Sequence, residues 1–339
     1  EMCRRYRGNG ASARARCHVV IIGFVERRFV NKVRGLCTSR GEVVHCERIN
    51  GYLMPSADVY VTEVSSPLSD VPPIRFGSMP RAKGFTLSAE DREQFVAENP
   101  LCEQWIRPYW GADEFLNRKE RYCLWLLDAN EDEIAQCPLV VERINRVREE
   151  RLASKAPSTR KFAETPMLFA QIAQPVGDGD YLLIPRLSSE KRSYIPIGFV
   201  GNDVIASDLA YLVPSASVYH FGVLSSQFHN VWVRMVAGRF KSDYRYAKDL
   251  VYNTFIWPTV SQPSRGEIGA CAQEILDVRE RHRAQRIGDL YKRDHMPDDL
   301  LAAHMALDAA VERAYGVDFA GDEDKIIAYL FKLYEAATA

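Results

Sequence analysis

The chain has 339 residues, of which 47% are hydrophobic and 26% are charged, an ordinary balance for a soluble globular protein. The length predicts two or three domains, and the absence of any run of 18 apolar residues excludes a membrane-spanning helix. The formal net charge of −1 does not by itself indicate a nucleic-acid-binding protein, so local clusters of charge decide that question.

The N-terminal part is predicted to contain two strands followed by a linker. Residues 17–25 (CHVVIIGFV) are apolar throughout, which is typical of a buried strand, and residues 57–64 (ADVYVTEV) alternate as a second strand would. Residues 65–84 are rich in Pro, Ser and Gly, which indicates a linker or an extended surface loop. The chain begins with Glu1 rather than Met, so we expect that an N-terminal part of a longer protein is missing.

Two helices are predicted next from their first residues. Ser88 followed by Asp91 indicates the capped start of a helix over residues 88–99. Pro138 indicates the start of a helix over residues 138–156. This second helix has one apolar stripe and an arginine-rich opposite face.

A β-rich core and a helical end complete the prediction. The expected strands are 121–128, 181–187, 194–200, 209–215 and 217–224. An amphipathic helix is expected over residues 225–240. Three further helices with apolar stripes at helical spacing are expected at residues 265–283, 297–316 and 323–337.

The sequence contains no recognisable catalytic or metal-binding motif. It has no glycine-rich nucleotide loop, no GxSxG and no HExxH. The cysteines form no CxxC pair and no zinc spacing, which favours free thiols in a reducing cytosol. These cysteines are Cys3, Cys17, Cys37, Cys46, Cys102, Cys123, Cys137 and Cys271.

Residues 238–253 (GRFKSDYRYAKDLVYN) interleave charges and rings. In an extended segment Lys241, Asp243 and Arg245 would project to one face. Such a face suits the base edges of a DNA major groove, because Lys or Arg donates to guanine and Asp accepts from cytosine. The alternative is a surface strand with cross-strand ion pairs. We expect the aromatic residues of this stretch, Phe240, Tyr244, Tyr246 and Tyr252, to pack beneath it and fix it.

The arginine-rich face of the 138–156 helix has two interpretations. Its cations, which include Arg148 and Arg151, belong to a positive cluster over residues 143–161. They could bind DNA phosphates, or they could form a solvated surface, and the sequence does not favour either.

Three stretches resemble the target-recognition region of single-chain type II restriction–modification enzymes of the MmeI-like family and of related bacterial N6-adenine DNA methyltransferases. These stretches are residues 72–84, 181–199 and 218–258. Residues 18–24 resemble the last strands of that family's methyltransferase domain, and residues 259–339 resemble its C-terminal helical domain. The family's glycine-rich cofactor loop and Asn-Pro-Pro-aromatic motif are absent from the chain.

The resemblance implies specific DNA-contacting residues. Lys241 and Asp243, with Arg245 beside them, match the family's base-reading positions, and Arg186 and Asp208 form a second pair by their spacing. Both pairs have the chemistry for a G·C base pair. The same resemblance implies phosphate contacts at flanking positions, and these are Ser188, Ser189, Lys191 and Arg192.

The expected fold is α+β, with a mixed-sheet target-recognition domain at 79–258 and a helical domain at 259–339. Residues 1–78 would be a remnant of a methyltransferase α/β sheet with its linker. The expected function is sequence-specific recognition of double-stranded DNA for an S-adenosylmethionine-dependent adenine-N6 methyltransferase, in a monomer in the bacterial cytoplasm. The missing methyltransferase domain would hold the cofactor, and this part of the protein would hold no cofactor. The alternatives are a non-catalytic interaction scaffold and, last, an enzyme with an unrecognised centre.

Overall fold

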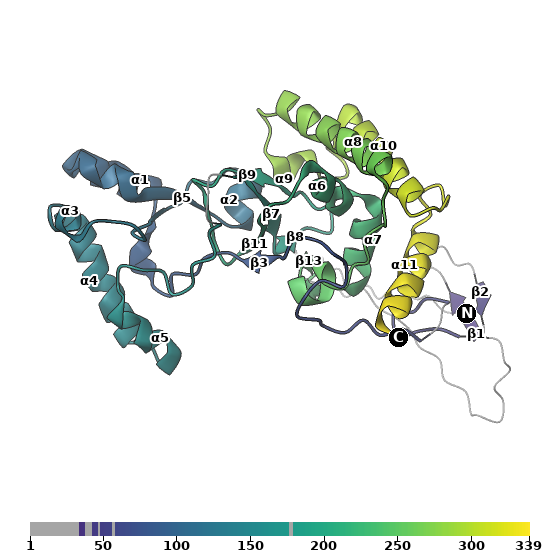
Figure 1. The fold of residues 1–339 in the computed structure, drawn as a ribbon, viewed down its shortest axis with the longest axis horizontal. Coiled ribbons are helices and arrows are strands. Elements are labelled where there is room, and N and C mark those ends of the chain that lie inside the picture. Colours follow the sequence, from purple (N-terminus) through teal and green to yellow (C-terminus); the bar gives the residue numbers. More distant parts are fainter. Residues whose placement is uncertain (1–33, 38–42, 47, 56–57, 176–178) are drawn as a thin grey trace, which may run out of the picture. The chain divides into compact units, whose positions relative to one another are not determined.

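The computed structural model describes residues 34–37, 43–46, 48–55, 58–175 and 179–339. The chain divides into two units, residues 1–58 and residues 59–339, which are described separately (Figure 1). In the first unit, β1 (Arg34–Cys37) pairs with β2 (Val43–Cys46) in an antiparallel ladder. The predicted strand at 17–25 lies outside the described residues.

The second unit contains a four-stranded sheet whose strand order is β10–β5–β6–β4. Short helices and α4 cover this sheet, and their aromatic and aliphatic side chains form a core that includes Phe85, Phe95 and Val147. The elements are η2 (Lys83–Phe85), β4 (Thr86–Leu87), α1 (Ala89–Glu98), η3 (Pro100–Trp105), β5 (Ile106–Trp110), β6 (Tyr122–Leu124), α3 (Glu131–Ala135), α4 (Pro138–Leu152), α5 (Pro157–Lys161), η4 (Phe162–Glu164) and β10 (Ile205–Ala206).

The helix starts of this region follow the capping residues of the sequence. Ser88 caps α1, and its side chain and that of Asp91 each accept a hydrogen bond from the other's backbone N–H. Pro138 is the first residue of α4, where its missing N–H costs nothing. Both predicted helices are confirmed, although each ends earlier than expected.

A second sheet, ordered β3–β11–β7–β9, has β7 buried along its whole length. A third, small, three-stranded sheet has the order β12–β13–β8. The chain passes from the second sheet into this one through a single residue, Arg186, which separates β7 from β8. The strands are β3 (Arg75–Phe76), β7 (Tyr181–Pro185), β8 (Leu187–Ser188), β9 (Gly198–Val200), β11 (Ala210–Val213), β12 (Gly238–Phe240) and β13 (Asp243–Arg245). The stretch expected to be a linker therefore supplies β3, which pairs with β11.

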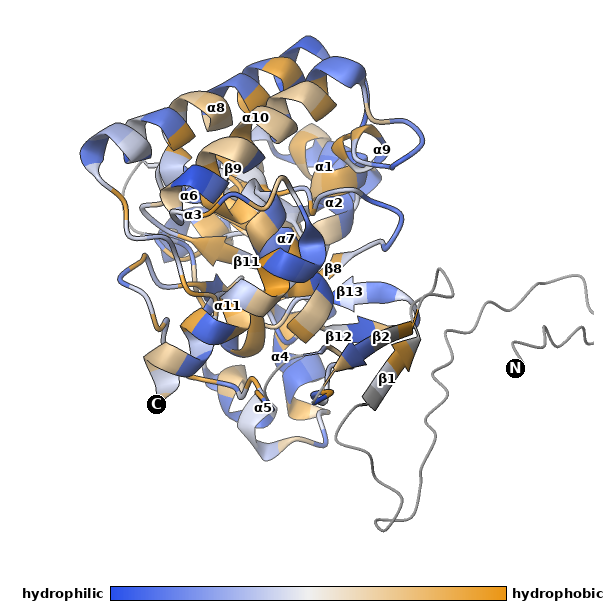
Figure 2. Cartoon of the chain, turned by 90° about the vertical axis from the view of Figure 1, so that its right-hand side faces the viewer, coloured by the Kyte–Doolittle hydropathy of each residue, from blue (hydrophilic) through white to orange (hydrophobic). Residues whose placement is uncertain are grey.

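Helices make up most of the remaining chain. They are α2 (Ala112–Asn117), α6 (Val218–Ser225), α7 (Gln227–Val236), η5 (Lys248–Tyr252), α8 (Gln262–Arg281), α9 (Ile287–Leu290), α10 (Asp298–Ala314) and α11 (Glu323–Thr338). The long helices α8 and α10 lie side by side and α11 packs on α7, as both views show (Figures 1 and 2). The predicted C-terminal helices are confirmed, as is the mixed α and β class. No helix in the described part of the chain is long and apolar enough to cross a membrane.

Two predicted strands are wrong. Residues 217–224 form α6, which is buried on nearly every side, and a helix without a polar face has the same apolar pattern as a buried strand. Residues 58–64 join no sheet. The Val64 N–H bonds to the Asp249 carbonyl at 3.0 Å, and the Thr62 N–H bonds to the Tyr334 hydroxyl at 3.1 Å. Two backbone N–H groups of this segment thus bond to a helical turn and to a side chain rather than to a neighbouring strand.

Candidate nucleic-acid interface

The charged stretch at 238–253 folds into a hairpin. β12 and β13 pair so that Phe240 lies opposite Asp243, and Lys241 and Ser242 form the turn between them. Lys241 has φ +57, a left-handed conformation that reverses the chain. The expectation of one shared face is therefore wrong for Lys241, which sits at the tip of a turn and does not alternate with Asp243 and Arg245.

The register of the small sheet decides which side chains share its exposed face. Directly opposed residues of antiparallel strands point to the same side, and side chains alternate along each strand. Arg245 lies opposite Leu187 of β8, and Asp243 lies opposite Phe240 of β12. One face therefore presents these four side chains together. The opposite face holds Ser188, which is buried.

The charges on this face are available to a ligand. Lys241 and Arg245 are exposed and Asp243 is half-buried. Among the residues that the structure describes, none of the three takes part in an ion pair. The cross-strand ion pairs of the alternative interpretation are therefore absent from this part of the structure.

The Asp243 carboxylate is oriented by the loop that follows β8. Its Oδ1 accepts a 3.3 Å hydrogen bond from the Glu190 backbone N–H. Arg192, in the same loop, is half-buried, and its Nε donates to the Gly288 carbonyl at 3.2 Å. Burial lowers the pKa of Arg192, and the nearby Asp243 carboxylate opposes that shift. The loop after β8 thus supplies both the Glu190 N–H that bonds to the Asp243 carboxylate and the Arg192 cation near it.

Tyr246 fixes the base of the hairpin from below. Its ring is buried, its N–H bonds to the Arg186 carbonyl at 2.9 Å, and its hydroxyl lies 3.0 Å from His229 Nε2. His229 Nδ1 donates to the Leu224 carbonyl at 2.8 Å, so Nε2 accepts the proton of the tyrosine. Burial lowers the pKa of His229 to about 4, which keeps this imidazole neutral. Packing beneath the hairpin is thus confirmed for Tyr246.

Phe240 does not pack beneath the hairpin. Its side chain is 61% exposed on the face that carries Asp243. The expected packing role is therefore wrong for this ring, whereas Tyr252 is buried as expected. This exposure could not be predicted, because the turn at Lys241 sets the register of the hairpin and contains no glycine.

Arg186 and Asp208, the second predicted pair, lie next to each other. Arg186 Nη1 donates a 2.6 Å hydrogen bond to the Asp208 backbone carbonyl. The guanidinium also lies over the rings of Phe76, at 5.0 Å, and Tyr211, at 5.7 Å. Arg186 bonds to the backbone carbonyl of Asp208, so this contact leaves the Asp208 carboxylate free to accept another hydrogen bond.

The predicted phosphate-contacting loop is attached to the C-terminal helices. The Arg293 N–H bonds to the Lys191 carbonyl at 2.9 Å, and the Ser193 N–H bonds to the Tyr291 carbonyl at 3.1 Å. Lys191 is exposed and Ser189 is half-buried, so both side chains can be reached. Ser188 cannot be reached: its hydroxyl is buried and has no hydrogen-bond partner among the described residues. The predicted phosphate contact by the Ser188 hydroxyl is therefore wrong.

Arg151 is a structural residue, and its predicted phosphate contact is also wrong. Its side chain is buried, and the guanidinium donates to the carbonyls of Phe162, Thr165, Pro80 and Leu168 at 2.7 to 3.0 Å. The sequence holds a sign of this, because Val140, Val147 and Arg151 fall on one stripe at helical spacing. Arg148 is exposed, which both interpretations of this helix face require, so its phosphate contact stays a prediction.

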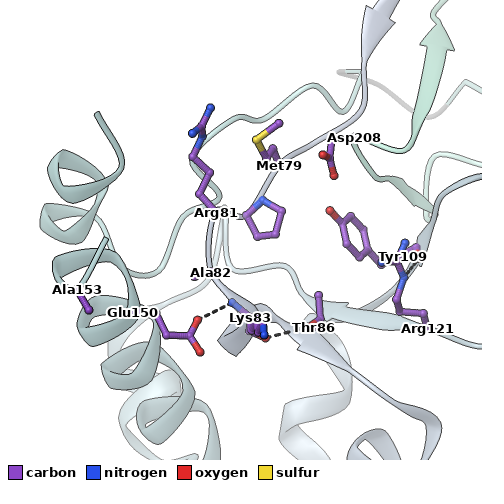
Figure 3. A pocket seen from close by; sticks show the side chains of 11 residues that line it. Met79, Arg81, Ala82, Lys83, Thr86, Tyr109, Arg121, Glu150, Ala153 and Asp208 are labelled. Carbon is purple, nitrogen blue, oxygen red and sulfur yellow. Dashed lines mark hydrogen bonds between the residues drawn. The ribbon is translucent and has the colours of Figure 1, made fainter. Parts of the chain in front are cut away.

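A pocket of about 710 Å³ opens beside Asp208 (Figure 3). Its walls include the exposed cations Arg81 and Lys83, and Tyr109, whose ring points toward Asp208. Burial raises the pKa of Tyr109, and the Asp208 carboxylate adds to that shift. The lining of the pocket thus includes two exposed cations and Asp208 of the second predicted pair.

A buried polar network joins the loop after β8 to the C-terminal helices. The Tyr194 hydroxyl donates to Asp308 Oδ2 at 2.7 Å, and the Gln227 N–H donates to Asp308 Oδ1 at 2.6 Å. Burial raises the pKa of Asp308 to about 7, although both hydrogen bonds act against the shift. The Tyr194 ring stacks on His304, with ring centroids 4.1 Å apart. The described residues contain no His, Cys, Asp and Glu cluster suited to a metal ion.

Comparisons with known proteins match the whole described second unit. A family model for the target recognition domain of MmeI matches residues 55–259, and one for the C-terminal domain of MmeI matches residues 260–339. The chain is 35% identical to DNA methyltransferase A of Bacillus subtilis (strain 168), over 97% of this chain and 37% of that protein.

A solved structure gives the same match in three dimensions. The type IIL restriction–modification enzyme MmeI, determined in complex with DNA, superposes with a TM-score of 0.83 at 42% identity. The match covers 88% of this chain and 40% of that one. The chain thus spans less than half the length of each of these two proteins.

Proposed function

The chain belongs to the family defined by the target recognition and C-terminal domains of MmeI, and from this premise we propose that it selects the DNA sequence on which a methyltransferase acts. The single observation that best supports this proposal is the exposed face of the β12–β13–β8 sheet. There Asp243 and Arg245 project from one strand with no ion-pair partner among the described residues, and Lys241 stands at the adjacent tip. The solved MmeI relative binds DNA.

The chemistry of this face suits the major groove. A carboxylate accepts from cytosine N4, and a Lys or Arg donates to guanine O6 and N7. Lys241 lies in the turn of the hairpin and Asp243 directly follows that turn, so the two side chains can meet the two bases of one G·C pair. Arg186 and Asp208 offer the same two groups at a second place, and Asp208 lines a pocket whose walls also hold the cations Arg81 and Lys83.

The proposed phosphate contacts hold the duplex without reading its sequence. The side chains that remain for this role are Ser189, Lys191, Arg148 and the half-buried Arg192. Cations at phosphates release condensed counterions, so the affinity for duplex falls steeply with salt.

Methyl transfer belongs to another part of the parent protein in this proposal. The chain contains neither a glycine-rich cofactor loop nor an Asn-Pro-Pro-aromatic motif, so its residues do not fit S-adenosylmethionine. When bound in the parent, the cofactor supplies the methyl group. This chain would hold the duplex while the target adenine is flipped toward the missing methyltransferase domain. We further propose that the parent acts as a monomer.

The limits of the domains are also a proposal. The predicted recognition domain began at residue 79, but β3 (Arg75–Phe76) pairs within its sheet and the chain divides at Asp58. We therefore place its start near residue 59 and keep residue 258 as its end.

A salt-titrated DNA-binding measurement tests the proposal. The protein should bind duplex DNA, with log Kd rising linearly with log salt concentration. A scaffold that only joins another subunit would show no affinity for duplex at any salt concentration, and that result would overturn the proposal.

A further inference from the structure

The exposed face of the β12–β13–β8 sheet carries apolar side chains beside its charged ones. Phe240 is 61% exposed and Leu187 is 43% exposed. Phe240 lies directly opposite Asp243, and Leu187 lies directly opposite Arg245. Directly opposed residues on antiparallel strands have Cβ atoms about 4.5–5.5 Å apart. Each charged residue on this face therefore has an exposed apolar neighbour within contact distance.

Single exposed apolar residues are common on proteins, so exposure alone means little. The position of Phe240 is what distinguishes it. Of the other rings of the stretch, Tyr246 and Tyr252 are buried, and Tyr244 is half-buried on the opposite face with Arg239 over its ring, whereas Phe240 lies on the charged face. Arg245, exposed on this face, and Lys241, exposed at the adjacent turn, give the hairpin positive charge that complements a phosphate backbone. These features together indicate duplex DNA as the occupant of the face.

The major groove offers an apolar group that such a ring can contact. The C5 position of a pyrimidine lies at the groove edge, and in thymine it bears a methyl group. In cytosine, C5 is next to the carbon that carries N4, the amino group that a carboxylate reads. A ring beside a carboxylate bound to N4 therefore reaches the C5 edge of the same base or of its stacked neighbour.

We propose that Phe240 is a specificity-determining residue that contacts the C5 edge of a pyrimidine at, or next to, the base pair read by Asp243. The contact excludes water from the hydrogen bond between Asp243 and the base, and it makes the protein sensitive to C5 methylation. This inference rests on the proposed function, because it requires Asp243 to lie in the groove.

The test uses the intact parent enzyme and duplexes that carry its mapped methylation site. At each position of the site and its flanks, a methyl group is added to cytosine C5 or removed from thymine by deoxyuridine. At one or two adjacent positions, this change should alter the wild-type methylation rate by at least about threefold, which is the effect expected from gaining or losing one buried methyl contact. Phe240→Ala should abolish that sensitivity, and Phe240→Leu should retain part of it.

A matched control is Met305→Ala, which removes an apolar side chain of similar exposure (62%) from α10. It should leave the sensitivity unchanged. Sensitivity that persists in Phe240→Ala, or a wild-type enzyme that ignores C5 methylation throughout its site, would overturn the inference.

Asp243→Ala in the same assay separates this inference from the proposed function. If Asp243→Ala changes the methylated sequence while Phe240→Ala changes nothing, base reading stands and the role of Phe240 falls. If Asp243→Ala also leaves the methylated sequence unchanged, both fall.

Discussion

The guanidinium of Arg186 donates a 2.6 Å hydrogen bond to the backbone carbonyl of Asp208. Because the bond uses the main chain, Asp208→Asn should leave stability within about 0.5 kcal/mol of wild type. It should nevertheless change the base preferred at one position of the methylated site, since an amide does not act solely as an acceptor. Mapping of the methylated sequence together with urea unfolding measures both effects. An unchanged site would remove Asp208 from the reading residues.

Arg186→Ala should differ from Asp208→Asn by also losing stability. The substitution leaves the Asp208 carbonyl without its donor and removes the cation from above the Phe76 and Tyr211 rings. We expect a loss of about 1–2 kcal/mol in the free energy of unfolding, in addition to a changed preference. A variant with wild-type stability would show that the contact is not formed in solution.

Arg151→Ala should destabilise the fold by about 2–4 kcal/mol. The guanidinium donates to four backbone carbonyls in a buried site; alanine removes this donor from the carbonyls of Pro80 and Leu168, and it removes one of two donors from those of Phe162 and Thr165. Denaturant unfolding gives the size of the loss. A variant as stable as wild type would contradict the buried position of Arg151.

Arg148→Ala is the matched comparison on the same helix, because its side chain is exposed. Its stability should change by less than about 0.5 kcal/mol. Its affinity for duplex should fall for all sequences, and the slope of log Kd against log salt should decrease by about 1. An unaltered slope would assign Arg148 to a solvated surface.

Asp308 should make stability depend on pH. Burial raises its pKa to about 7 in the folded protein, above the ordinary value of 3.8. The folded state therefore keeps this proton where the unfolded state has lost it, so this group's contribution to stability falls as pH rises from about 4 to about 7. Asparagine cannot ionise, so the stability of Asp308→Asn should lack this part of the pH dependence.

The measurement is the difference in the free energy of unfolding between wild type and Asp308→Asn across pH 4 to 8. As pH rises, wild type should lose stability relative to the variant, by about 1.4 kcal/mol for each unit by which folding raises the pKa of Asp308. Asn can still accept from the Gln227 N–H, which limits other losses. A difference that is constant with pH would mean that Asp308 has an ordinary pKa.

Local signals in the sequence were sufficient for much of the fold. The Ser88–Asp91 cap and Pro138 placed two helix starts, since capping depends on neighbouring residues alone. Tertiary packing decided what was missed. The apolar residues of α6 fit a buried strand equally well, and only the surrounding core makes them helical.

The candidate site was predictable in its chemistry but not in its geometry. Asp243 and Arg245 do share a face, as alternation requires, but Lys241 takes a left-handed turn that the sequence does not mark with glycine. That turn sets the register, and the register exposes Phe240. Arg151 looked like a solvent-facing cation because the segments that cover it, near Pro80 and after residue 161, are distant or irregular in the sequence.

The most direct test of base reading is the methylated sequence of the intact parent enzyme, mapped in DNA after methylation by wild type, Lys241→Ala and Asp243→Ala. We expect each variant to relax or change the preference at one G·C pair of the site, the same pair for both, by about 1–3 kcal/mol of discrimination. The other positions of the site should keep their preferences. If both variants fold, methylate DNA and retain the wild-type sequence preference at every position, the hairpin does not read the DNA sequence.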